Sequence, residues 1–281
     1  MTRTLSKTLF ILLLCSTSAF TEDLRVITWN IESGGNDPAV IAKQLGQLEK
    51  YDIVGLTEVH PANSRRYKEA MNAAHGKSGN SFQSTLSSTG NDDRLMLLYD
   101  SSSLSLIETY ELVAHDGNRM NTVDFRYRSP LVGRLRHNAT ATEFLVVLVH
   151  LARGKEEVRQ MQAEGMRTWA AAQTVPVIGI GDFNFDFVFA TEKGNKGFEL
   201  FLAGDTWKWV RPEKLVDTNW YDPEPDGKDN YPGSCLDFTF TAGPAKKWAA
   251  QSRVIERTGD FPDDDTTSDH RPVELLINFG K

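Results

Sequence analysis

The chain has 281 residues, enough for one large domain or two small ones. Hydrophobic residues make up 40% of it and charged residues 25%, which is ordinary for a globular enzyme. Its formal net charge of -7 argues against a protein that binds nucleic acid non-specifically over a wide surface. The charge does not exclude a nuclease that holds a few phosphates through a metal ion and a few arginines.

The N-terminal segment is typical of a secretory signal peptide. Arg3 and Lys7 form a short basic start, and an apolar run at residues 9–15 and small residues at 17–19 follow. This apolar run is too short to span a bilayer as a permanent helix. A buried N-terminal helix is the alternative interpretation.

Cleavage after Ala19 would leave 29 basic and 38 acidic residues, a net charge of -9. Cys235 would then be the only cysteine, so the mature chain would contain no intrachain disulfide. Export without a disulfide favours a periplasmic or extracellular bacterial protein over a small disulfide-rich domain. We therefore expect a signal peptide at residues 1–19 and a single domain at 20–281, present as a monomer without a membrane span.

Apolar runs predict strands, and apolar residues that recur on one face predict helices. In the N-terminal half we expect a strand at residues 24–29, a helix at 38–50, a strand at 53–57, a helix at 63–74, a loop at 78–93, and strands at 95–99, 104–110 and 121–127. In the C-terminal half we expect a strand at 144–149, a helix at 155–173, a strand at 175–180, a loop at 221–233, strands at 236–241 and 251–256, a loop at 260–268 and a strand at 273–277. Because strands and helices mix without strict β-α-β alternation, the pattern predicts an α/β or α+β sandwich rather than a Rossmann-type sheet.

Polar residues stand where these apolar runs meet turns. They are Asn30, Glu58, His150, Asp182, Asn184, Asp237, Asp269 and His270. Each alone has an ordinary explanation as a turn former, a solvated carboxylate, a helix cap or a structural histidine. Together, carboxylates and imidazoles at strand ends suit metal-assisted attack on a phosphate, because a rigid sheet can present them to one ligand.

This ordered series resembles the endonuclease/exonuclease/phosphatase superfamily, which includes deoxyribonuclease I, exonuclease III, inositol polyphosphate phosphatases and bacterial sphingomyelinases. The motifs are Thr28-Trp29-Asn30, Leu56-Thr57-Glu58-Val59, Val149-His150-Leu151, Gly181-Asp182-Phe183-Asn184, Leu236-Asp237-Phe238 and Ser268-Asp269-His270. They follow the family's order over nearly the whole mature chain. The resemblance implies a four-layer sandwich, in which two packed mixed β-sheets are flanked by helices.

The resemblance also implies a divalent-metal site. Glu58 matches the family's metal-binding glutamate, and Asn30 and Asp269 are the residues expected to help it. Carboxylate and water oxygens are the ligands that Mg²⁺ prefers, so Mg²⁺ is the expected cofactor, with Mn²⁺ and Ca²⁺ as alternatives.

The other matched residues are catalytic in the family. Asp237 matches the acid that orients a histidine, and His270 matches that histidine. Asp182 matches the carboxylate near the attacking water, Asn184 the residue that holds a phosphate oxygen, and His150 the second active-site histidine. Whether Asp182 or His270 accepts the proton from water is left open by the sequence.

Three further groups have competing interpretations. Arg128 resembles a phosphate-contacting arginine of the nuclease branch, and a surface salt bridge is the equal alternative. Basic residues after His150 alternate with glutamates, which indicates a helix with mixed charge on a solvated face; they are Arg153, Lys155, Arg159 and Arg167. Three tryptophans are expected to pack in the core or in loops rather than stack on bases; they are Trp207, Trp209 and Trp220.

The sequence thus predicts an exported, divalent-metal-dependent hydrolase of phosphate esters, with phosphodiester bonds of nucleic acid as the leading substrate. The alternative is a phosphomonoesterase or a phospholipid head-group phosphodiesterase of the same fold, such as an inositol phosphatase or a sphingomyelinase. A catalytically inactive binding protein is disfavoured because the matched series is complete. Thr57 and Val149 differ from the family's commonest residues, but neither is a matched catalytic position.

Overall fold

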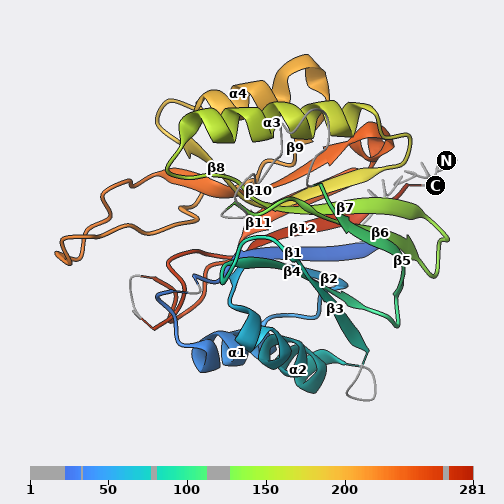
Figure 1. The fold of residues 1–281 in the computed structure, drawn as a ribbon, viewed down its shortest axis with the longest axis horizontal. Helices are drawn as coiled ribbons and strands as arrows, with labels where there is room; N and C mark the ends of the chain where they lie inside the picture. The colour runs from blue at the N-terminus through green and yellow to red at the C-terminus, as the bar shows by residue number, and fades with distance from the viewer. Residues whose placement is uncertain (1–22, 33, 77–80, 113–126, 262–265, 281) are drawn as a thin grey trace, which may run out of the picture.

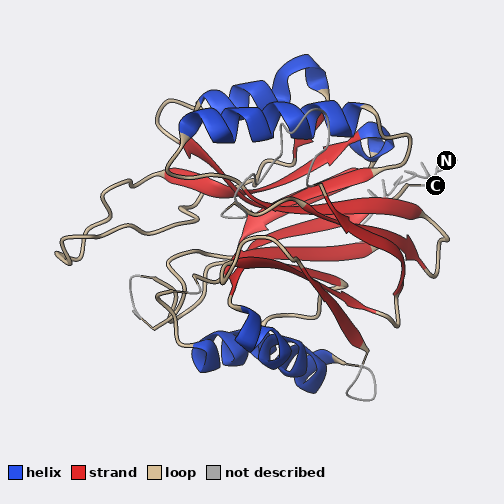
Figure 2. Cartoon of the chain, viewed as in Figure 1, coloured by secondary structure: helices blue, strands red, loops and turns tan. Residues whose placement is uncertain are grey.

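The computed structural model describes residues 23–32, 34–76, 81–112, 127–261 and 266–280. Two six-stranded β-sheets pack face to face, and helices cover the outer face of each (Figures 1 and 2). Each sheet contains one parallel pair of strands among antiparallel ones. The predicted four-layer sandwich of mixed sheets is therefore confirmed.

The first sheet has the strand order β11-β12-β1-β2-β4-β3. Its strands are β1 (Leu24–Asn30), β2 (Ile53–Val59), β3 (Phe82–Leu86), β4 (Arg94–Asp100), β11 (Ala249–Val254) and β12 (Val273–Asn278). Helices α1 (Pro38–Gln47) and α2 (Ser64–His75) cover its outer face (Figure 1). A short 3₁₀ turn, Pro61–Asn63, leads into α2.

The second sheet has the strand order β5-β6-β7-β8-β10-β9. Its strands are β5 (Leu104–Glu111), β6 (Leu131–His137), β7 (Glu143–His150), β8 (Val177–Val188), β9 (Trp207–Trp209) and β10 (Ser234–Ala242). Helices α3 (Glu156–Ala171) and α4 (Lys196–Leu202) cover its outer face (Figure 1). Two further 3₁₀ turns lie at Ala203–Asp205 and Gly243–Lys247.

Side chains that alternate along each strand divide the core into three apolar clusters. Val26 of β1 belongs to the same cluster as Leu148 and Ile180 of the second sheet, so this cluster lies between the sheets. Its neighbour Ile27 belongs instead to the cluster that contains Ile41 of α1. Strands buried on both faces explain the nearly continuous apolar runs in the sequence.

Helix α1 begins at a residue whose side chain caps it. The Asp37 side chain accepts a hydrogen bond of 2.7 Å from the Ala39 amide, and Pro38 occupies the first turn, where its missing N–H costs nothing. The predicted helix continued to residue 50, but Leu48 is extended with a ψ of 158°. The helix therefore ends at Gln47, and the chain turns into β2.

Several short elements were not predicted. Strand β3 lies inside the predicted loop at 78–93, which is a correction; its half-buried position at the sheet edge tolerates the Ser-rich sequence that suggested a loop. Strands β6 and β9 and helix α4 were also missed. Strand β6 carries two arginines and a glycine, and β9 and α4 are too short to show a clear period.

Some predictions fall on residues 1–22 or 113–126, outside the described ranges. They are the signal peptide at 1–19 and nearly all of the strand at 121–127, whose last residue, Tyr127, lies in a bend. Among the described residues, no helix has the length and apolar character to cross a membrane. Cys235 is buried with a free thiol.

The tryptophans pack as expected. Trp207 is buried, and its ring stacks on Phe201 with 4.9 Å between ring centroids. Trp209 contacts Phe238 across the same aromatic cluster, with 5.4 Å between centroids. Trp220 lies 6.1 Å from Phe261 in the loops.

Candidate active site

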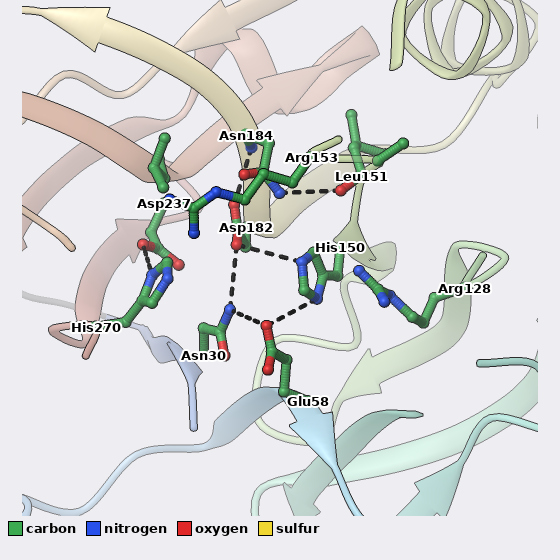
Figure 3. A network of polar contacts seen from close by, with 12 residues as sticks. Asn30, Glu58, Arg128, His150, Leu151, Arg153, Asp182, Asn184, Asp237 and His270 are labelled. Carbon is green, nitrogen blue, oxygen red and sulfur yellow. Dashed lines mark hydrogen bonds and ion pairs between the residues drawn. The ribbon is translucent and has the colours of Figure 1, made fainter. Parts of the chain in front are cut away.

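The predicted site residues meet at one end of the sandwich because neighbouring strands place them side by side. In the second sheet, Asp182 pairs with His150 of β7 on one side and with Asp237 of β10 on the other. In the first sheet, Asn30 at the end of β1 pairs with Thr57, next to Glu58. Figure 3 shows these side chains converging from both sheets.

Irregular backbone aims three of these side chains. Glu58 and Asn184 have positive φ angles of 60° and 51°, and the pairing of β2 with β4 shifts register around Glu58. Gly181, with φ of 131°, precedes Asp182; a Cβ there would lie 2.0 Å from the Val149 carbonyl oxygen, so only glycine fits. The sequence suggested a turn after Ile180, but β8 continues to Val188, so Asp182 and Asn184 lie inside a strand.

Asp237 and His270 form a buried pair. The Asp237 carboxylate lies 2.7 Å from Nδ1 of His270. Burial acts to lower the pKa of His270, but the negative charges of Asp237 and Asp269 outweigh it and raise this pKa well above its usual range. This shift favours the cationic imidazole, whose Nε2 lies 3.7 Å from a carboxylate oxygen of Asp269.

The backbone of His270 is anchored to β1. The Ser268 hydroxyl donates to the Asn30 carbonyl at 2.6 Å and accepts from the His270 amide at 2.9 Å. The indole of Trp29 donates to the His270 carbonyl at 2.8 Å. These contacts fix a loop residue against a strand, which orients the imidazole.

Asn30 links the two sheets. Its Nδ2 donates to Glu58 at 3.0 Å and to Asp182 at 3.1 Å, and its Oδ1 accepts from the Glu32 amide at 3.0 Å. In this orientation the side chain positions two carboxylates and its oxygen is engaged by the backbone. The predicted role of Asn30 as a metal ligand stays a prediction.

His150 lies between two carboxylates. Its Nε2 is 3.4 Å from Asp182, and its Nδ1 is 3.7 Å from Glu58 without a hydrogen-bond partner in the described structure. Burial, reinforced by the positive charge of Arg128, lowers the pKa of His150 well below its usual value. The second histidine is therefore neutral, in contrast to His270.

Asp182 occupies the centre of the site. Its Oδ1 accepts from the Asn184 amide at 2.9 Å, and the Asn184 side chain donates to the Leu151 carbonyl at 3.0 Å. Burial, together with the charge of Asp237, raises the pKa of Asp182 to about 7. A carboxylate with this pKa can gain or lose a proton near neutral pH.

A second group of carboxylates lies on the Glu58 side. Asp269 donates its amide to Glu32 at 3.0 Å, and burial and the charge of Asp269 raise the pKa of Glu32 to about 7. Burial and the charge of Asp93 raise the pKa of Glu58. Ligand atoms of Glu58, Asp93 and His150 all lie within 4.8 Å of one another. The carboxylate oxygens of Glu58, Glu32 and Asp269, which no lysine or arginine pairs with in the described structure, fit a divalent cation such as Mg²⁺.

Two arginines border the site. Arg128 donates to Asp93 at 2.7 Å and also lies beside His150 (Figure 3). The salt bridge and the position near the site, which the sequence offered as alternatives, therefore both occur. Arg153, in the loop after β7, is also near the site, since its positive charge contributes to the lowered pKa of His150. Its side chain is exposed, as predicted, but it lies outside the predicted helix, because α3 begins only at Glu156.

The prediction of a solvated side chain was wrong for Arg159. Its side chain is buried, and it donates to the carbonyl oxygens of Ala152 at 3.0 Å and Arg153 at 2.8 Å. Gln162 accepts from the Ala152 amide at 2.9 Å. These contacts hold the loop that carries Arg153.

Sequence reasoning missed Glu32, Asp93 and Arg153 as neighbours of the site. Glu32 stands two residues after Asn30 in a turn with φ of 49°, and Arg153 three residues after His150. Their closeness in sequence to matched residues was the available signal. Asp93 carried no such signal, because its place depends on Arg128, which is distant in sequence.

A model of the Endonuclease/Exonuclease/phosphatase family matches residues 27–270. No curated protein sequence matches the chain. Among solved structures, TDP2 of D. rerio complexed with a single-strand DNA product is similar with a TM-score of 0.67 and 17% identity, over 91% of this chain and 98% of that one. A mannosyl-6-phosphatase of Bacteroides thetaiotaomicron gives 0.64 and 17%, over 91% and 99%. The human Nocturnin catalytic domain gives 0.59 and 16%, over 91% and 94%. At these identities the structural likeness establishes the fold.

Proposed function

The chain belongs to the Endonuclease/Exonuclease/phosphatase family, and we propose that it is a divalent-metal-dependent phosphodiesterase acting on nucleic acid. The observation that carries the proposal is the placement of Asp182 between two unlike groups. On one side lies the Asp237–His270 pair, with 2.7 Å between its partners. On the other, Asn30 joins Asp182 to Glu58.

Glu58 and Asp269 would hold the metal ion, with Glu32 beside them. Their side chains are partly open to solvent, with exposed fractions of 24% for Glu58 and 29% for Asp269. The ion, when bound, neutralises charge that builds on the phosphate oxygens during attack.

The protein's own residues divide the proton chemistry. Water attacks phosphorus, its proton passes to Asp182, and the bond from phosphorus to the leaving oxygen breaks, after which that oxygen takes a proton from solvent. The raised pKa of Asp182, about 7, suits a proton acceptor at neutral pH. The cationic His270, oriented by Asp237, donates a hydrogen bond to the phosphoryl oxygen that gains charge.

Phosphodiester hydrolysis can be tested directly. The purified protein would be assayed on supercoiled plasmid, single-stranded oligonucleotide, bis(p-nitrophenyl) phosphate and p-nitrophenyl phosphate, each with Mg²⁺ and with EDTA. We expect metal-dependent cleavage of the diesters that is lost in Asp182→Asn and kept in Asp205→Asn, whose side chain is exposed. No metal-dependent cleavage of any substrate would refute the proposal.

A phosphomonoesterase is the second candidate, favoured by the net charge of -7, which repels a long polyanion such as nucleic acid more than a small phosphomonoester. Hydrolysis of p-nitrophenyl phosphate, with no cleavage of either nucleic acid or the synthetic diester, would support it.

Export belongs to the proposal as well. It is supported by the basic start and the apolar run at residues 9–15. Expression in a bacterium should yield a protein shortened at its N-terminus in the periplasm or medium, and mass spectrometry would locate the cut. A full-length protein in the cytoplasmic fraction would contradict export.

A further inference from the structure

A cleft lies beside the candidate active site, at the base of the loop between β9 and β10. Part of this loop extends away from the body of the protein (Figure 1). The cleft has a volume of about 660 Å³, and Arg153, Asn219, Tyr221, Tyr231 and Leu236 contribute to its walls. None of these residues has a role in the reaction proposed above.

The cleft and the site share parts of the chain. Leu236 directly precedes Asp237, and Asn219 forms a β-bridge with His270. Arg153 lines the cleft, and its positive charge also acts on His150 of the site. A group bonded to a phosphate at the site would therefore enter the cleft on the Asp237–His270 side.

The cleft presents flat aromatic surfaces to solvent. The rings of Tyr221 and Tyr231 stack with 5.6 Å between centroids and 24° between planes. Their exposed fractions, 39% and 60%, are among the highest for large hydrophobic residues in the described structure. The Arg153 guanidinium lies 5.4 Å from the centre of the Tyr221 ring. Exposed rings next to a guanidinium are suited to stacking on another planar ring.

The cleft also offers an unused hydrogen-bond acceptor. Asn219 is only 2% exposed, and its Oδ1 has no hydrogen-bond partner within the described ranges. A buried acceptor without a partner is costly, so a ligand that brings a donor gains by binding there. The exocyclic amines and ring N–H groups of nucleobases are such donors.

The charge around the cleft disfavours a duplex. The part of the loop at residues 221–233 carries Asp222, Glu224, Asp226 and Asp229 and one cation, Lys228. The second phosphate backbone of a duplex would approach this acidic loop and be repelled. An unpaired base belongs to a single strand, so no second phosphate backbone approaches the acidic loop.

We propose that this tyrosine cleft (Arg153, Asn219, Tyr221 and Tyr231) binds an unpaired nucleobase next to the scissile phosphate. The substrate class is then single-stranded nucleic acid or a single-stranded end. The inference rests on the proposed phosphodiesterase function and adds the source of its base recognition.

The test compares two chromogenic diesters that differ in the base. Thymidine 5′-(p-nitrophenyl phosphate) carries a nucleobase, and methyl p-nitrophenyl phosphate does not. We expect the double variant Tyr221→Ala, Tyr231→Ala to raise KM about tenfold or more for the thymidine ester, as expected for lost base stacking. Its kcat/KM for the methyl ester should stay unchanged.

Conservative and distant variants serve as controls. Tyr221→Phe with Tyr231→Phe keeps both rings and should retain the KM for the thymidine ester. Met161→Ala, at an exposed position on α3, should leave KM and kcat unchanged for both esters. Fluorescence anisotropy with labelled oligothymidine and the matching duplex, in EDTA, measures binding without turnover; the alanine variant should lose affinity for the single strand.

The outcomes separate the inference from the proposed function. If neither ester is hydrolysed, the phosphodiesterase proposal fails. If both are hydrolysed and the alanine variant treats them as the native protein does, only the base-binding inference is overturned. An equal KM increase for both esters would also overturn it, because the tyrosines would then act on the site as a whole. Tighter native binding to duplex than to single strand would refute the substrate class.

Discussion

The two sides of the site differ in how their charge is balanced. On the Asp237 side, a buried carboxylate faces a buried imidazole at 2.7 Å, so anion and cation are both supplied by the chain. On the Glu58 side, the only ion pairs of Glu58 and Asp269 in the described part of the chain are with histidines, at 3.7 Å. The charges on the Asp237 side are therefore balanced by the protein itself, whereas the negative charge on the Glu58 side is available to a bound cation.

This contrast assigns different consequences to similar mutations. A change on the Asp237 side should alter the chemical step without altering metal affinity. A change on the Glu58 side should alter metal affinity first. Experiments that measure both quantities can therefore break or sharpen the comparison.

The largest effect is expected for Asp237→Asn. The substitution removes the main charge that raises the pKa of His270, so the imidazole loses both its orientation and its cationic form. We expect kcat to fall by about 10²- to 10⁴-fold, the usual contribution of a positioned acid or base. The midpoint of a Mg²⁺ titration of activity should not move. Asp205→Asn, at an exposed position, is the matched control; a shifted Mg²⁺ midpoint in Asp237→Asn would contradict the division.

Glu58→Gln should have the opposite pattern. It removes a carboxylate from the proposed metal site while keeping the acceptor for Asn30. The Mg²⁺ concentration for half-maximal activity should rise by about tenfold or more, with much of kcat recovered at saturating ion. Glu256→Gln, which removes a surface partner of Lys214, should leave the titration unchanged. Complete loss of activity at every Mg²⁺ concentration would instead give Glu58 a role in the chemical step.

A pH experiment tests the negative charge on the Glu58 side, which includes Glu32. In the folded protein the pKa of Glu32 is raised from its ordinary value of 4.5 to about 7, so folding favours the protonated carboxyl. The stability that this carboxyl contributes is therefore present at low pH and is lost as the pH rises from about 4.5 to about 7. Mg²⁺ binding needs the deprotonated form. The increase in Tm caused by Mg²⁺ should therefore be larger at pH 8 than at pH 5.5.

Comparing melting curves with and without Mg²⁺ at each pH cancels contributions that do not depend on the ion. Glu32→Gln should flatten the dependence of the Tm increase on pH. An increase in Tm that is larger at pH 5.5 than at pH 8 would show that the carboxylates of the Glu58 side do not bind the ion.

The sequence could predict the sandwich and the meeting of the matched residues, because both depend on apolar strands that end in polar residues. His150 does end its strand, whereas Asp182 and Asp237 lie inside β8 and β10, which run further than their apolar runs indicate. The position of Glu58 could not be derived, since it depends on a positive φ at a bulge. The solvated face predicted for Arg159 is wrong, because a pattern of alternating charge does not distinguish a buried arginine from a solvated one.

The smallest expected effect lies at the junction of the two sides. Ser268 bridges the Asn30 carbonyl and the His270 amide, so its hydroxyl ties the loop of one side to the strand of the other. Ser268→Ala removes both hydrogen bonds in a buried place and should lower the free energy of unfolding by about 1–3 kcal/mol. Because the imidazole is still paired with Asp237, kcat should fall less than in Asp237→Asn. Ser105→Ala, which removes an exposed hydrogen bond to Asn138, is the control in urea unfolding. A Ser268→Ala protein with native stability and a kcat as low as that of Asp237→Asn would mean that the serine takes part in the chemistry rather than joining the two sides.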